Sequence, residues 1–148
     1  MSEQLTDFLA LVNDIVQAAI VIFGVAVFLY NLQHSVRDRV TRAFNSLLFF
    51  VVIVYFSELI VTRATVPISA EVWIRLGWIG IAMVPAAQFH LSDALLVTTG
   101  DVSRRRRLLV RVWYIAGILF FLAVLFTDLV VTDLVPVAHA PHMSSGVL

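Results

Sequence analysis

The chain alternates between long apolar stretches and short polar joints. Mostly apolar residues cover about residues 8–32, 44–62, 72–97 and 108–135. Each stretch approaches or exceeds the roughly 20 residues that a helix needs to cross a bilayer core. Backbone groups in lipid must hydrogen-bond within their own segment, which a helix achieves, and the alternation typical of barrel strands is absent. The pattern predicts an all-α integral membrane four-helix bundle in one domain, residues 1–148, with a tail over 136–148.

Composition agrees with a protein that lies in lipid. Hydrophobic residues make up 61% of the chain and charged residues 14%, and the mean hydropathy is +0.98. Soluble domains are closer to about half apolar. The formal net charge is zero, which gives no indication of a nucleic-acid partner, and the absence of cysteine excludes disulfides and thiolate metal sites. Glu3 and Asp7 make the segment before the first stretch acidic, unlike the basic start of a cleavable signal peptide.

Two of the three joints are rich in arginine. Positive residues near helix ends mark the cytoplasmic side of a membrane. Both joints are therefore predicted to face the cytoplasm, which places the N-terminus and the C-terminus on the extracytoplasmic side. We interpret the second joint as a topology determinant that also touches anionic lipid, rather than as a phosphoinositide or nucleic-acid patch. The arginines concerned are Arg37, Arg39 and Arg42 in the first joint and Arg104, Arg105, Arg106 and Arg107 in the second.

Several ionisable residues lie within the outer part of the apolar stretches. Charged side chains inside membrane helices are costly, so each is a candidate for function. At about 1.5 Å per residue, these side chains are predicted to share one depth, close to Arg75 at the start of the third helix. They form either a water-filled ligand pocket or a set of interhelical salt bridges that fixes packing. The predicted outer pocket consists of Asp14, Gln17, Glu58, Arg63 and Asp128.

The third stretch is predicted to lie at the centre of the bundle. Small and polar residues occur on two of its faces, which indicates protein on both sides. Pro85 lies in the middle and predicts a kink, because proline leaves one carbonyl without its helical donor. Trp78 is predicted to face lipid. The helix-packing residues are Gly77, Gly80, Pro85 and Ala87.

His90 and Asp93 are three residues apart and are predicted to form an inner polar pair on one helix face. Such a pair could relay protons, and His90 could alternatively bind haem, although haem usually needs two axial ligands at matching depth. His34, the other inner histidine, lies near a joint. His139 and His142 in the tail lack an acidic or thiolate companion. We therefore predict no metal site and no cofactor.

The motifs that carry enzymatic chemistry are missing. The sequence has no glycine-rich phosphate loop, no nucleophile elbow and no metal-ligand spacing on a helix. We therefore predict no catalytic residues and expect that the protein is not an enzyme.

Three segments in order carry a resemblance to a known family. They are residues 39–48 (RVTRAFNSLL), residues 73–90 (WIRLGWIGIAMVPAAQFH), and residues 127–131 (TDLVV), followed by the tail residues 140–143 (APHM). Together they resemble the seven-transmembrane N-terminal sensor region found before bacterial histidine kinases and some cyclases. Gly77-Trp78-x-Gly80-x-x-x-x-Pro85 is the most specific part. The resemblance covers the first four of seven helices, and it implies a signalling role and a multi-pass protein of the bacterial inner membrane.

Two functional classes follow from these observations. The first is a membrane-embedded sensor or signal-input module that binds a small or lipidic ligand or a partner helix. The alternative is a small accessory subunit packed against a larger membrane complex, respiratory or photosynthetic. A transporter is disfavoured, because four helices show no internal repeat. Both classes imply the lipid bilayer and other membrane helices as partners, either in a homo-oligomer or in a larger complex.

Overall fold

The computed structural model describes residues 3–34, 37–62, 67–127, 131–135 and 142–145. Four of the helices that it describes are long and apolar enough to cross a membrane. The predicted all-α membrane class is therefore confirmed. Two short strands follow the last helix. The elements are α1 (Glu3–His34), α2 (Arg39–Val61), α3 (Pro67–Thr98), α4 (Arg104–Phe126), β1 (Val131–Val135) and β2 (His142–Ser145).

Each helix begins four or five residues before its predicted start, because the apolar stretch marks only the part that suits hydrocarbon. The helical backbone continues to the nearest capping residue. Asp38 caps α2 by accepting a hydrogen bond from the Thr41 amide at 2.8 Å, and Ser103 caps α4. Pro67 is the first residue of α3, where a missing amide donor costs nothing. Gly100, with φ of 87°, ends the turn after α3.

The predicted end of the fourth helix is wrong. The prediction extended the helix to about residue 135, but α4 ends at Phe126 and Thr127 is already extended. Residues Val131–Val135 instead form β1, which pairs antiparallel with β2 in the predicted tail. The sequence stays largely apolar after α4 ends at Phe126, but Asp128 interrupts the apolar stretch. The β-branched residues that follow, such as Val131 and Thr132, favour strands.

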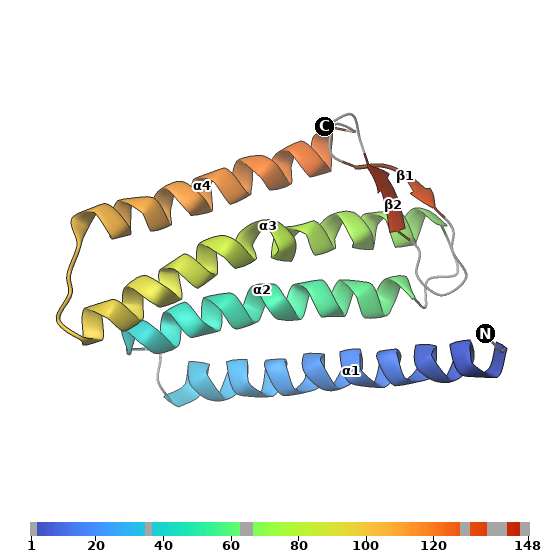
Figure 1. Ribbon diagram of the computed structural model, residues 1–148, viewed down its shortest axis with the longest axis horizontal. Helices are drawn as coiled ribbons and strands as arrows, with labels where there is room; N and C mark the ends of the chain where they lie inside the picture. The colour runs from blue at the N-terminus through green and yellow to red at the C-terminus, as the bar shows by residue number, and fades with distance from the viewer. Residues whose placement is uncertain (1–2, 35–36, 63–66, 128–130, 136–141, 146–148) are drawn as a thin grey trace.

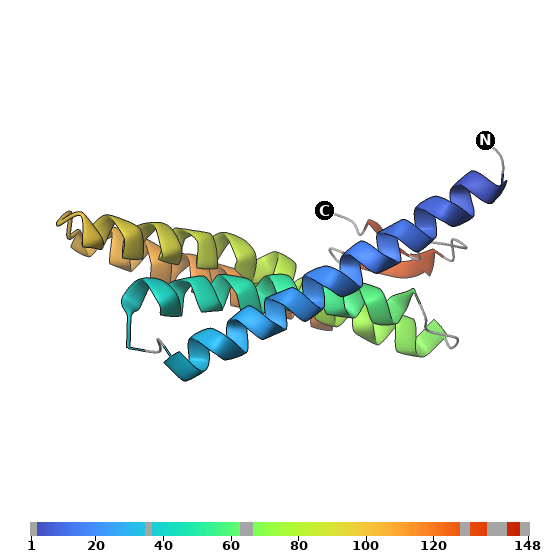
Figure 2. The same cartoon turned by 90° about the horizontal axis from the view of Figure 1, so that it is seen from below.

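The helices lie side by side in chain order (Figure 1). Helix α2 packs between α1 and α3, and α3 packs between α2 and α4. The prediction that α3 has protein on two sides is confirmed. Helix α1 crosses α2 obliquely (Figure 2). The outer members of the row are α1 and α4. Much of their apolar surface is exposed and is available to lipid.

Small residues allow the helices to approach closely. A Cβ atom added at Gly80 would collide with the Val54 side chain and the Phe50 carbonyl oxygen of α2. On the other side of α3, a Cβ added at Gly117 of α4 would lie 2.8 Å from the Ala82 carbonyl oxygen. Contacts this short exclude any larger side chain without displacement of a helix.

The predicted packing residues of α3 divide into two groups. Gly77, Gly80 and Ala87 are buried, as predicted. Pro85 is exposed, so its assignment as a packing residue is wrong. Pro85 lies inside α3, and the ribbon of α3 changes direction along its length (Figure 1). The kink at Pro85 itself stays a prediction. Trp78 was predicted to face lipid, but it packs against Phe120 of α4, with the two ring centroids 6.1 Å apart.

Candidate functional site: a polar cavity at the arginine end

One end of the helical row carries most of the positive charge. There the C-terminal ends of α1 and α3 meet the N-terminal ends of α2 and α4 (Figure 1), and the N-terminus of α1 lies at the opposite end. We call this the arginine end. Its arginines are Arg37, Arg39, Arg42, Arg104, Arg105, Arg106, Arg107 and Arg111.

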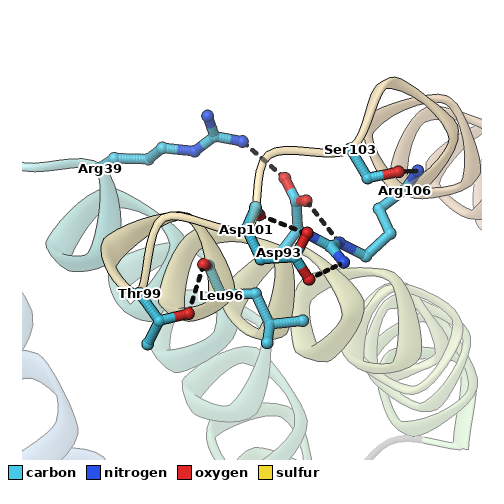
Figure 3. Close-up of polar contacts among 7 residues, drawn as sticks. All are labelled: Arg39, Asp93, Leu96, Thr99, Asp101, Ser103 and Arg106. Atoms are coloured by element: carbon cyan, nitrogen blue, oxygen red, sulfur yellow. Dashed lines mark hydrogen bonds and ion pairs between the residues drawn. The ribbon is translucent and has the colours of Figure 1, made fainter.

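Asp93 is the buried charge at this end. Its side chain is 2% exposed on α3 and lies between two arginines from the neighbouring helices (Figure 3). Arg39 Nη2 of α2 lies 2.6 Å from Asp93 Oδ2, and Arg106 Nε of α4 lies 3.4 Å from Asp93 Oδ1. Both arginines occur in the first turn of their helices, just after the capping residues. The caps therefore position the two cations that neutralise the buried carboxylate.

Arg106 also holds the connection between α3 and α4. Its Nη1 lies 2.7 Å from Asp101 Oδ2, and its Nη2 donates to the Asp101 carbonyl oxygen (Figure 3). The hydrogen bond and positive charge of Arg106 lower the pKa of the exposed Asp101 carboxyl below its usual value of 3.8. Asp101 therefore stays ionised at neutral pH and helps to orient Arg106 toward Asp93.

A second polar group joins the same three helices through one hydroxyl. Tyr114 Oη of α4 lies 2.9 Å from Ser46 Oγ of α2 and 3.3 Å from His90 Nδ1 of α3. The His90 and Tyr114 rings meet edge to face, with centroids 6.0 Å apart. In apolar surroundings such hydrogen bonds between helices stabilise one arrangement of the helices against others.

The two polar groups border one cavity of about 290 Å³. Guanidinium, imidazole and phenol groups line it, together with a carboxylate that is already paired. This combination of donors favours a small polar or anionic ligand over an apolar one. The lining residues are Arg39, His90, Asp93, Arg107, Val110, Arg111 and Tyr114.

The predicted inner pair is brought to this cavity but is not a hydrogen-bonded pair. His90 bonds to Tyr114, whereas Asp93 bonds to Arg39 and Arg106. Sequence reasoning missed these partners, because they are far away in the chain and depend on how the helices are paired. The available signal was that a carboxylate within an apolar helix needs a cation, and two arginine-rich joints were predicted on its side.

The predicted outer pocket is only partly within the described residues, because Arg63 and Asp128 lie outside them. Asp14 is half-buried on α1 and Glu58 is exposed on α2, and neither side chain forms a hydrogen bond or ion pair with another described residue. Gln17 is 4% exposed, and its Oε1 has no hydrogen-bond partner among the described residues. The outer pocket stays a prediction.

Arg75 was predicted to lie at the level of the outer acids. It forms an ion pair with Glu71 on its own helix, with Nε 3.2 Å from Oε1. Its Nη1 also donates to the Val124 carbonyl oxygen at 2.9 Å, which links α3 to α4. The described contacts of Arg75 therefore serve helix packing.

The predicted absence of a metal site concerns residues that are only partly described. Within the described residues, no three His, Asp or Glu side chains are grouped closely enough to hold a metal ion. His139 lies outside the described residues, and only the backbone of His142 is described, as the first residue of β2.

Comparisons with protein-family models, with curated proteins and with solved structures find no match to this chain. What the cavity can do is therefore inferred from its residues and their geometry.

Proposed function

We propose that the chain is a membrane-embedded, non-enzymatic sensor or signal-input module. The observation that carries the proposal is the polar cavity at the arginine end, where Asp93 is held by arginines of α2 and α4. The same three helices are joined again through the Tyr114 hydroxyl. A stimulus that changes one of these contacts acts on α2, α3 and α4 together.

The cavity gives a physical route from ligand to helix movement. Buried polar pairs exchange partners in discrete steps, so a helix row that they join has a small number of alternative packings. A ligand shifts the populations only when it binds one packing more tightly. Arg39 lines the cavity together with Arg107 and Arg111, so a small anion bound there competes with Asp93 for the Arg39 guanidinium group, which supplies that difference in affinity.

The proposed orientation places the arginine end in the cytoplasm and the N-terminus outside. It is supported by the gathering of both arginine-rich helix connections at one end (Figure 1). The resemblance to the first four helices of a histidine-kinase sensor region leads us to propose a bacterial inner-membrane location. The gene's reading frame beyond Leu148 tests this part directly, because a kinase or cyclase domain there would support the assignment.

Distance measurements between α3 and α4 test the sensor mechanism. The chain has no cysteine, so Leu95→Cys and Val112→Cys, both at exposed positions, can be spin-labelled specifically. In lipid nanodiscs we expect two discrete distances, with Tyr114→Phe increasing the minor one because it removes the hydroxyl shared by Ser46 and His90. One distance, the same in the parent and in Tyr114→Phe, would argue against a bistable module.

Tyr55→Phe is the matched control for that experiment. Tyr55 is half-buried on α2, and its hydroxyl makes no hydrogen bond to the described residues. Tyr55→Phe removes the same group as Tyr114→Phe but leaves the hydrogen bonds of Tyr114 intact. We expect the parental distance distribution in this variant.

A small accessory subunit of a larger membrane complex is the second candidate. It is favoured by the open row, in which α1 packs mainly against α2 and α4 packs mainly against α3. Exposed apolar residues along α1, such as Phe8, Ile22 and Phe23, are available to a foreign helix as well as to lipid. Purification in mild detergent distinguishes the candidates: an accessory subunit stays with a stoichiometric partner, and its α3–α4 distance is single.

A further inference from the structure

A second cavity lies beside the first on the N-terminal part of α4. It has a volume of about 390 Å³ and is lined by Arg104, Arg107, Leu108 and Arg111. The three arginines are spaced by three and four residues, which places them on one face of the helix. We call these four residues the α4 arginine groove.

The arginines of the groove carry charge that the described part of the chain leaves unbalanced. Arg39 and Arg106 are paired with Asp93, but Arg104, Arg107 and Arg111 make no ion pair or hydrogen bond to any described residue. All three are exposed. The N-terminus of α4 adds its own partial positive charge. The groove therefore has unused capacity for an anion, and planar guanidinium groups suit the oxygens of a phosphate.

An apolar ridge continues from the groove along the same face of α4. Leu108, Ile115 and Leu119 follow at helical spacing and are 61%, 57% and 62% exposed. The ridge leads from the arginines toward the middle of a 23-residue apolar helix. A ligand with an anionic head and long apolar chains matches both parts, whereas a free phosphate uses only the arginines.

From this arrangement we infer that the α4 arginine groove binds the headgroup phosphate of an anionic phospholipid, whose acyl chains lie along Leu108, Ile115 and Leu119. The proposed site differs from the general attraction of basic residues to an anionic membrane surface, because binding depends on the particular arginines that line the groove. It does not depend on the sensor function, since an accessory subunit would carry the same groove.

Native mass spectrometry of the full chain in detergent tests the inference, with phosphatidylglycerol and phosphatidylcholine as probes. Because three arginines attract the anionic headgroup, we expect phosphatidylglycerol to bind roughly tenfold or more tightly than phosphatidylcholine. Arg107→Gln/Arg111→Gln should remove most of this preference. Equal affinity of the parental chain for the two lipids would overturn the inference.

The matched control is Arg37→Gln/Arg105→Gln. It removes the same charge from the same end of the row, but neither residue lines the groove. We expect the control to keep most of the preference for phosphatidylglycerol. If both double variants lose it equally, the attraction is a general surface effect and the site does not exist.

Two further measurements distinguish a folding defect from a loss of binding, and a lipid ligand from a free anion. Circular dichroism checks the helix content of each variant, and Arg107→Lys/Arg111→Lys, which keeps the charge, should retain part of the preference. Inorganic phosphate is added as a competitor. Failure of phosphate to displace phosphatidylglycerol supports a lipid site, whereas full displacement identifies a simple anion site and contradicts the inference.

Discussion

Arg39 and Asp93, 54 residues apart in the chain, form an ion pair in which Nη2 lies 2.6 Å from Oδ2. The two partners differ in exposure: the Arg39 side chain is 35% exposed and that of Asp93 is 2% exposed. The arginine can reach water or headgroups when its partner is removed, but the carboxylate cannot. Removal of Arg39 therefore leaves a buried charge with one partner fewer, whereas removal of Asp93 leaves an arginine that can become solvated.

This asymmetry predicts unequal effects of the two substitutions. Arg39→Gln leaves a buried carboxylate with one remaining cation and should destabilise the fold by about 3 kcal/mol. Asp93→Asn should cost about 1 kcal/mol, because its arginines become solvated. Unfolding in mixed micelles with increasing sodium dodecyl sulfate measures both. Asp7→Asn, at an exposed position of α1, is the control with little effect. A larger loss for Asp93→Asn than for Arg39→Gln would contradict the prediction.

The close approach of the helices predicts that a larger side chain in place of a buried glycine lowers the stability of the fold. Gly80→Leu and Gly117→Leu should each cost about 1–3 kcal/mol, because the new side chain meets the neighbouring helix. Ala116→Leu adds a similar side chain at the exposed position beside Gly117 and should have little effect. The same unfolding assay measures all three. If Ala116→Leu is as damaging as Gly117→Leu, the face of α4 that contacts α3 is assigned wrongly.

The buried amide of Gln17 gives a third prediction. Its Oε1 has no hydrogen-bond partner among the described residues, so Gln17→Leu should raise stability by about 1 kcal/mol. Asn31→Leu is the contrasting variant, because it breaks the 2.9 Å hydrogen bond between Asn31 and Asn45 across α1 and α2. That variant should lower stability by about 1 kcal/mol. A loss of stability in Gln17→Leu would instead indicate a partner for Oε1 and favour the predicted outer pocket.

Cysteine accessibility tests the proposed orientation. Gln4→Cys, near the N-terminus, should react with a membrane-impermeant reagent in intact cells, whereas Val102→Cys, between α3 and α4, should react only after permeabilisation. Both positions are exposed. Because the α3–α4 connection and the start of α2 lie at one end of the row, Arg37→Cys should behave like Val102→Cys. Labelling of Val102→Cys from outside would reverse the orientation.

The sequence by itself determined the features that depend on local composition. Apolar length marked four membrane helices, and small residues such as Gly77, Gly80 and Ala87 marked the buried part of α3. These predictions succeeded because the cost of placing a residue in lipid or in a tight helix contact depends mainly on its own size and polarity.

Only the tertiary structure decided which side chains meet. The pairing of Asp93 with Arg39 and Arg106, and of Tyr114 with Ser46 and His90, depends on the rotation and register of three helices. A rotation of one residue, about 100°, turns a side chain to another face, and periodicity within one helix contains no information about its neighbour. The end of α4 was missed for a related reason, because residues 131–135 are apolar enough for a helix and become a strand by pairing with β2.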